Sequence, residues 1–457
     1  MLLEAYGTLL EKGWQPVFRQ ARTHERALEH AFALPAVLGR RTVSRTICAL
    51  GRSDQDWSAD YKIYSRSQWS SQLLFDPVLD DYLSRYRRGP IGIAFDDTRL
   101  AKTGKKVPGA SWGRDPMSPP FQVNLLWGVR FLQAGLLFPH HRQGEVAARS
   151  LPVRFEEAPV VKKPGKRASQ KERQAYRQLQ KQRNLSVQTL QMMRELRRQW
   201  DDKGAALRRL LAALDGSFCN RTLFKADLDR IDLLARCRKD ARLCFPAPSG
   251  QRRRYATELF TPEQVRQDPH RPWKRTRIHL AGQFRWVRYK EVSGVLWQRG
   301  AGTRPLRLLV LAPQPYRLSR QARRNYRQPA YLLTTDRRTS IKPLLQTYVD
   351  RWQIEVNHRD EKSLLGVGQA QVRSPQSVPR HPAFVVACYS ALLLASLRCF
   401  GPTRTAAYQP LPKWRRNAKR PSLLDLLTLL RKELHETPVS FLVPSKLAQN
   451  LITHAYT

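Results

Sequence analysis

Apolar residues in the first part of the chain recur at helical spacing. In RALEHAFALPAVL and VLDDYLSRYRR the hydrophobic positions stand three or four residues apart, and no long alternating run interrupts them. This pattern predicts a helical region over residues 1–88.

The spacing changes to strict alternation at GPIGIAFDD. Ile91, Ile93 and Phe95 alternate after a Gly-Pro stop, which predicts a buried strand that ends on two adjacent aspartates. FQVNLLWGVRFL and QAGLLFPHH predict two neighbouring strands joined near residues 133–135. Further strands are predicted before LDGSF, where Asp215 precedes a glycine, and in DLLARCRKDARLCF at 232–245. Strands mixed with helical segments over 89–245 indicate an α/β unit.

The second half begins with alternation and ends with helical spacing. Residues 246–328 alternate like a β meander, and AYLLTTD at 330–336 predicts one more strand. YVDRWQIEVNHRDEK, at 348–362, is predicted to be helical throughout, and residues 373–457 are predicted to be mainly helical. The most apolar run, 382–397, is short and contains Cys, Tyr and Ser, which favours a buried helix over a membrane span.

The net charge of the chain indicates which class of molecule it binds. The chain has 81 Lys and Arg against 37 Asp and Glu, a net charge of +44, and the excess is spread along its length. A folded protein this basic is expected to bind a polyanion, most simply nucleic acid. Its six cysteines form no C-x-x-C pair, and its N-terminus lacks the pattern of a signal peptide, so we expect free thiols and a cytoplasmic location without membrane attachment.

Four side chains of the 348–362 helix share one face. At about 100° per residue, Tyr348, Arg351, Glu355 and Lys362 fall within an arc of about 60°. Ordinary surface pairs such as Arg351–Glu355 would also produce this spacing. Alternatively, the carboxylate of Glu355 beside two cations and the phenol of Tyr348 forms a surface that could bind and act on phosphate groups.

Three acidic positions are candidates for metal ligands. Asp96 or Asp97 closes the first strand, Asp215 follows a later strand, and Glu355 lies within a helix. Two divalent cations about 4 Å apart need carboxylates from separate elements that meet at one point. Each aspartate site, taken alone, is equally typical of a turn.

The order of these motifs resembles the DDE transposases of bacterial insertion sequences. Tyr348-x2-Arg351-x3-Glu355-x6-Lys362 is similar to their Y-R-E-K motif, DDTRL to their first-aspartate motif and LDGSF to their second-aspartate site. The resemblance assigns the first catalytic acid to Asp96, with Asp97 as the alternative. It implies an α/β RNase H-like core, 89–245 and 329–372, interrupted by a β-rich insertion at 246–328. Helical regions flank this core: 1–88 is expected to bind DNA, and 373–457 is a candidate for dimerisation.

The resemblance also implies roles for individual residues. Asp96, Asp215 and Glu355 would hold two Mg²⁺ ions, for which Mn²⁺ is a possible substitute. The expected DNA contacts are Tyr348, Arg351 and Lys362 on phosphates, and Trp286 or Trp297 on a flipped base, although core packing is the more ordinary role of a tryptophan.

Three functions are compatible with these features. The expected one is a transposase that binds double-stranded DNA as a homodimer on paired transposon ends, cleaves it and transfers the strand. A nuclease with the same acids, which hydrolyses DNA without strand transfer, is the first alternative. A non-enzymatic nucleic-acid-binding protein derived from a transposase is the second.

Overall fold

A single mixed sheet forms the centre of the protein. The computed structural model describes residues 1–115, 118–119, 121–142, 146–319, 321–415 and 418–436. Within them ten strands form one sheet in the order β2-β3-β1-β5-β6-β12-β9-β8-β7, with β4 paired to β3. The strands of this sheet are β1 (Ile91–Ala101), β2 (Ser111–Arg114), β3 (Leu125–Phe138), β4 (Arg149–Glu157), β5 (Leu210–Leu214), β6 (Ile231–Arg236), β7 (Lys274–Leu280), β8 (Gln283–Val295), β9 (Leu306–Leu311) and β12 (Ala330–Thr334). A separate small pair is formed by β10 (Pro315–Tyr316) and β11 (Asn325–Tyr326).

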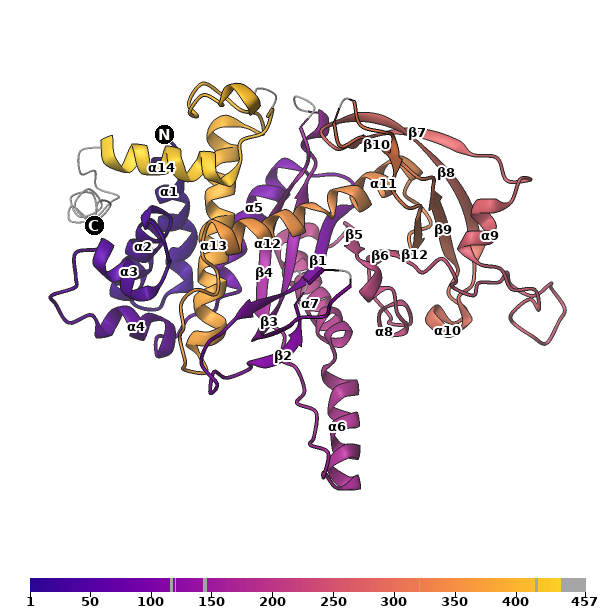
Figure 1. Cartoon of the computed structure of the whole chain (residues 1–457), viewed down its shortest axis with the longest axis horizontal. Coiled ribbons are helices and arrows are strands. Elements are labelled where there is room, and N and C mark those ends of the chain that lie inside the picture. The colour runs from indigo at the N-terminus through magenta and orange to yellow at the C-terminus, as the bar shows by residue number, and fades with distance from the viewer. Residues whose placement is uncertain (116–117, 120, 143–145, 320, 416–417, 437–457) are drawn as a thin grey trace.

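Helices gather at one end of this sheet and across one of its faces. The N-terminal helices are α1 (Leu2–Trp14), α2 (Ala21–Ala36), α3 (Val43–Ala49), α4 (Ser58–Ser65) and α5 (Asp76–Arg85). They pack with α13 (Ser377–Phe400) and α14 (Leu423–Glu436) at the end opposite β7 and β8 (Figure 1). The predicted helical character of 1–88 is therefore confirmed. The predicted helical tail is confirmed for α13 and α14, whereas most of the described residues of 401–422 between them are irregular. Residues 437–457 lie outside the described part.

The remaining helices lie between these two ends or project from the body. They are α6 (Gln170–Arg183), α7 (Leu185–Trp200), α8 (Arg221–Phe224), α9 (Pro262–Gln267), α10 (Gln298–Ala301), α11 (Ile341–Asp350) and α12 (Gln353–Ser363). Figure 1 shows α6 projecting away from the sheet, while α12 and α11 follow one another across it. Because α12 packs on β1, β3 and β4, it covers the sheet where the first aspartates lie.

Three predicted strand boundaries were wrong. β6 ends at Arg236, although the strand was predicted to extend to residue 245. β1 does not end on the two aspartates but continues to Ala101, because antiparallel pairing with β3 extends from Ile93 to Ala101. Residues 125–138 form one long strand rather than two joined near 133–135. The predicted break corresponds only to a shift in register against β4 between Ala134 and Gly135.

The predicted helix over 348–362 is in fact two helices. α11 ends at Asp350 and α12 begins at Gln353, while the backbone of Arg351 and Trp352 stays in the right-handed helical region. The N–H groups of Ile354 and Glu355 donate to the carbonyls of Arg351 and Trp352, three residues back, so the chain tightens without reversing. Uniform helical spacing is therefore only approximate across this junction.

The β-rich region does not form a sheet of its own. β9 pairs with β12, and β8 and β7 follow, so these strands extend the sheet that contains β1. The meander predicted for 246–328 is confirmed for 274–311, whereas residues 246–273 contain isolated bridges and α9. The fold is thus mixed α/β with one large mixed sheet, which agrees with the predicted α/β class.

The most apolar helix is a core helix. By length and composition α13 could cross a membrane, but 83% of its most apolar window is buried inside the protein. It packs against α1 and β4. This environment agrees with the expectation of a buried helix.

The pairing of β1 with β3 leaves no room for a side chain at Gly128. A Cβ atom there would lie 2.3 Å from the carbonyl oxygen of Leu100, a backbone atom that cannot rotate away. We expect Gly128→Ala to lower the free energy of unfolding by about 2 to 3 kcal/mol in chemical denaturation. Gly165→Ala is the matched control, because no atom lies within 4 Å of the methyl group that alanine would add there. Equal stability of the two variants would contradict the close strand approach.

Candidate active site

Asp96 faces the helix α12. Because side chains alternate along a strand, Asp96 shares its face of β1 with Ala94, which packs against Ile354 of α12. Its cross-strand neighbour is Gln133. Asp97 points to the opposite face. Alternation in the sequence could not choose between Asp96 and Asp97. The position of α12 favours Asp96, because its side chain lies on the face of β1 that α12 covers.

Asp215 lies level with Asp96 on the adjoining strand. β1 and β5 are parallel, and Ala94 pairs with Ala213. Two residues further along, this register brings Asp96 beside Asp215, which directly follows Leu214 at the end of β5. Oδ1 of Asp215 accepts hydrogen bonds from the backbone N–H and the hydroxyl of Ser217, at 2.9 and 2.7 Å. These bonds fix the carboxylate at the strand end.

Burial and, to a lesser extent, neighbouring charges change the acidity of Asp96. Burial raises its pKa to about 6; the charge of His358 opposes this shift, and that of Asp215 adds to it. Burial also raises the pKa of Asp97, where Arg130 opposes the shift and Asp215 adds to it. Two buried carboxyl groups and Asp215 therefore lie close enough to act on one another electrostatically, as acids that share a cation would.

Arg351 has hydrogen-bond donors available beside this charge. Its Nη2 donates to Oε1 of Glu355 at 3.0 Å, as the predicted helical pair. Its Nε and Nη1 are buried and have no hydrogen-bond partner in the described part of the chain. Since buried donors are rarely left unpaired, these groups are suited to an anionic ligand. Glu355 is turned toward Arg351, with its side chain about a third exposed.

The other two residues of the predicted stripe also lie near the aspartates. Tyr348 is half-buried, and burial raises its pKa, with Arg236 and Arg351 opposing and Asp215 adding to the shift. Burial lowers the pKa of Lys362, while the nearby acids, Asp96 and Asp97 among them, oppose that change. The charges of the stripe and of the aspartates thus act on one another. Glu355 is linked to them only through Arg351.

His358 is a site residue that the sequence analysis missed. Its Nε2 lies 4.0 Å from Oδ2 of Asp96, and its Nδ1 lies 3.5 Å from Oε2 of the buried Glu361. Glu361 also accepts a hydrogen bond of 2.9 Å from Gln133, the cross-strand neighbour of Asp96. A signal was present in the sequence, because His358 stands seven residues after Arg351 and three after Glu355, on the same stripe.

The two candidate tryptophans differ in their surroundings. Trp286 is 62% exposed on β8, with the guanidinium of Arg275 over its ring at 5.2 Å. Trp297 packs edge-on against Phe224, with ring centroids 5.7 Å apart, beside the core. Trp286 is therefore accessible to a base, whereas Trp297 has the packing of a core tryptophan. Base contact by either residue stays a prediction.

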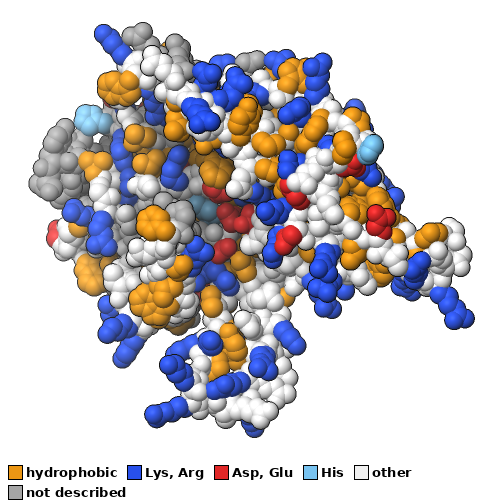
Figure 2. Space-filling view, turned by 45° about the vertical axis from the view of Figure 1, so that its right-hand side comes forward, with side chains coloured by type: hydrophobic (Ala, Val, Ile, Leu, Met, Phe, Trp, Pro, Cys, Tyr) orange, Lys and Arg blue, Asp and Glu red, His pale blue; other side chains and the backbone are white. Residues whose placement is uncertain are grey.

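The structure has two clefts lined by basic side chains, one of which begins beside Asp215. A cleft of about 780 Å³ begins at Gly216, next to Asp215, and its lining includes Arg236, Arg238, Lys239 and Arg266. Figure 2 shows acidic side chains gathered near the middle of one face, with a histidine beside them and lysines and arginines on several sides.

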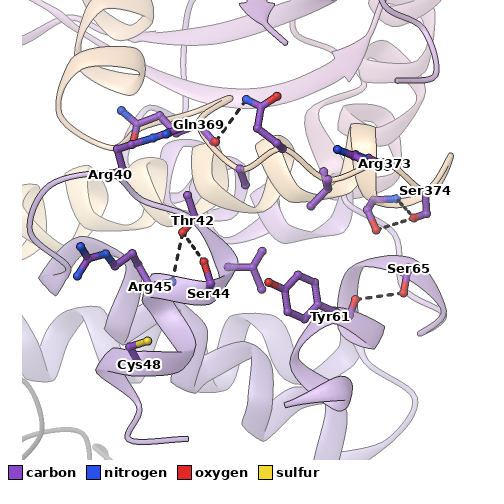
Figure 3. A pocket seen from close by; sticks show the side chains of 15 residues that line it. Arg40, Thr42, Ser44, Arg45, Cys48, Tyr61, Ser65, Gln369, Arg373 and Ser374 are labelled. Carbon is purple, nitrogen blue, oxygen red and sulfur yellow. Dashed lines mark hydrogen bonds between the residues drawn. The ribbon is translucent and has the colours of Figure 1, made fainter. Parts of the chain in front are cut away.

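A second cleft, of about 850 Å³, separates α3 and α4 from the chain that follows α12 (Figure 3). It is lined by Arg40, Arg45 and Arg373 together with Tyr61 and several hydroxyl groups, and no acid is among its lining residues. Its charge suits a polyanion, but the candidate catalytic acids do not line it.

The carboxylates fit a divalent cation in part. Oδ1 of Asp96 and Oδ1 of Asp215 accept hydrogen bonds. Oδ2 of each aspartate accepts no hydrogen bond from the described residues and is available to a cation. Hard carboxylate oxygens of this kind are the ligands that Mg²⁺ and Mn²⁺ prefer. No group of three or more His, Cys, Asp or Glu within the described ranges is set closely enough to form a complete metal site. Glu355 would complete it only by leaving Arg351.

No protein-family model matches the chain, and the search of curated proteins returns no relative.

Proposed function

We propose that the protein is a DDE-type DNA transposase that cleaves the ends of its element and joins them to target DNA. The observation that carries this proposal is that the parallel register of β1 and β5 brings Asp96 and Asp215 close together, with the charges of Arg351, His358 and Lys362 acting on them. Acids in this setting are suited to metal-assisted phosphodiester chemistry.

The sheet order supports the same proposal. The strands β4, β3 and β1 are antiparallel neighbours, and β5 and β6 continue from β1 in parallel. This arrangement is the one expected of an RNase H-like core, with the first acid on the central strand and the second at the end of the next. β7, β8 and β9 would then represent the β-rich insertion, built as an extension of the core sheet.

Asp96 and Asp215 would hold the first Mg²⁺ ion, and Glu355 would join them when phosphate takes its place on Arg351. Bound Mg²⁺ supplies a hydroxide or alkoxide nucleophile and stabilises charge on the leaving oxygen. The exchange of partners is electrostatically balanced, because Arg351 gives up one carboxylate and gains one phosphate oxygen.

The chain's own residues would orient the DNA. Buried Nε and Nη1 of Arg351 would donate to a phosphate oxygen, and Lys362 would contact a phosphate on the other side of Asp96. His358, held by Glu361, would keep the Asp96 carboxylate in place. Tyr348 would donate its hydroxyl to a phosphate near Asp215.

The proposed partners follow from the charge and the clefts. Double-stranded DNA is the polyanion that a net charge of +44 most directly fits, and the cleft beside Gly216 offers a basic path leading away from the acids. Action on two paired ends would require a homodimer, for which the C-terminal helices are candidates. The proposed location is the bacterial cytoplasm, with the protein associated with DNA.

A plasmid assay with labelled DNA ends separates this function from its alternatives. With Mg²⁺ present, we expect products in which the labelled ends are joined to the plasmid. Nicked DNA without joined products would instead identify a nuclease. A shifted band without cleavage would identify a DNA-binding protein that lacks catalysis.

A further inference from the structure

A β-hairpin next to the acids exposes large apolar side chains. Trp112 is 64% exposed on β2, and Leu125 is 62% exposed on β3. The ring of Trp112 lies against that of Trp127, with centroids 5.6 Å apart. Exposed aromatic and aliphatic groups that cluster on a folded surface commonly mark a binding site.

These side chains share one face with an exposed cation. Trp112 pairs with Trp127 and Arg114 with Leu125 across the two strands. Alternation along the strands places these four residues, which we call the hairpin face, on the same side of the sheet. Arg114 is exposed, so the face combines aromatic rings with a positive charge.

The hairpin is held rigidly against the core. Nη1 of Arg99 on β1 donates to the carbonyls of Ser111 and Gly128, at 2.8 and 2.9 Å, and thus joins β2 and β3. On the other side, Nε1 of Trp127 donates to the carbonyl of Gly104 at 3.1 Å. An aromatic surface fixed in this way loses little conformational entropy when a ligand binds.

The hairpin face lies on the same side of the sheet as the acid site, and the buried residues Leu100 and Lys102 lie between them. The N–H of Lys102 donates to the carbonyl of Trp127 at 3.0 Å, and Lys102 stands on the same side of the sheet as Asp96. Six residues of strand separate Lys102 from Asp96, which is about 20 Å. That length equals about six base-pair steps of DNA. Asp115, which follows Arg114, acts electrostatically on Lys362 at the end of α12.

We propose that the hairpin face binds unpaired bases of DNA about six nucleotides from the reacting phosphate, with a base stacked on Trp112. This proposal rests on the proposed function for its ligand, DNA, and for the place of the reacting phosphate at Asp96. Stacking on Trp112 would hold the strand locally unpaired, and Arg114 would contact its backbone.

Nucleic acid fits this face better than a second protein copy does. A base has a flat apolar face that stacks on an indole and tolerates any sequence, and its phosphate pairs with a neighbouring arginine. A second copy of a chain with a net charge of +44 would bring like charge toward Arg114 and the basic residues around it.

Binding measurements without Mg²⁺ test the proposal independently of cleavage. The probes are a 20-nucleotide oligo(dT), a duplex with a central unpaired stretch, and the fully paired duplex, each followed by fluorescence anisotropy at fixed salt. We expect Trp112→Ala to weaken binding of the first two about tenfold and to change duplex binding less than twofold. Trp112→Phe should restore most of the loss, because an aromatic ring remains.

Two controls make the result specific. Leu207→Ala removes another exposed apolar side chain, away from the hairpin and the candidate site, and should leave all three affinities unchanged. The unfolding temperature of each variant checks that the hairpin remains folded. Equal loss on paired and unpaired DNA, no loss at all, or a wild-type dimer that Trp112→Ala dissociates would each overturn the proposal. Because binding is measured without Mg²⁺ and without cleavage, a failure of the catalytic proposal stays distinguishable from a failure of this one.

Discussion

Asp96→Asn is expected to abolish DNA cleavage and, at neutral pH, to stabilise the metal-free protein. Loss of a metal-ligating carboxylate should lower the cleavage rate by at least about 10³-fold. The variant keeps the side-chain oxygen that accepts a hydrogen bond from the N–H of Asp97 at 2.9 Å. Its local geometry should therefore persist while its charge is lost.

The stability gain has a definite pH dependence. Burial raises the pKa of Asp96 to about 6 in the fold, above its ordinary value of 3.8. Between these values the folded state binds the proton more tightly than the unfolded state, so stability falls as pH rises from about 4 to 6. Above pH 6 the penalty is complete, and by linkage it amounts to about 3 kcal/mol at most. Asp96→Asn should remove it at pH 7.5 and have little effect at pH 4.

Chemical denaturation at these two pH values, with EDTA, measures the gain. Asp97→Asn is the matched control, because strand alternation places Asp97 on the opposite face of β1 from Asp96. It should retain cleavage within about tenfold of the wild type. Normal cleavage by Asp96→Asn together with loss in Asp97→Asn would identify Asp97 as the first metal ligand instead.

Glu355→Ala is expected to abolish cleavage while leaving DNA binding nearly intact. The side chain holds Nη2 of Arg351 at 3.0 Å, and the proposed function moves it to the metal when phosphate binds. Its removal deletes a ligand but frees a further donor on Arg351. The rate should fall by about 10³-fold or more, whereas affinity for end DNA should stay equal or rise slightly.

A gel-shift titration and the plasmid assay on the same preparation separate binding from catalysis. Glu25→Ala, which removes an exposed acid from α2, controls for the change in net charge. Persistent cleavage by Glu355→Ala would exclude Glu355 as a metal ligand. Joint loss of binding and cleavage would show that the Arg351–Glu355 pair is structural.

Local sequence patterns predicted which strands and helices form better than they predicted where each one begins and ends. Alternation through Ile91, Ile93 and Phe95 was sufficient to predict β1, but its continuation to Ala101 depends on pairing with β3, a partner that local spacing does not reveal. The junction at Arg351 and Trp352 was missed because both residues keep helical dihedral angles, so no breaker residue marks it. The extension of the core sheet by β9 could not be predicted, since alternation indicates a strand and not its neighbour.

Some residues of the candidate site could be predicted from their spacing along one helix. The helical stripe brought Tyr348, Arg351 and Lys362 toward the aspartates, because spacing on one helix face survives a tightened turn. His358 belonged to the same stripe and was overlooked. The contact of Glu361 with Gln133 could not be read from the sequence, because it depends on how α12 is oriented on the sheet.

Anomalous diffraction from crystals soaked in Mn²⁺ tests most directly whether the acids form a metal site. We predict a peak between the carboxyl groups of Asp96 and Asp215, at about 2.0 to 2.4 Å from an oxygen of each. With bound DNA, Glu355 should join the same ion. Crystals of well-diffracting protein in saturating Mn²⁺ that show no peak between these two aspartates would contradict the account.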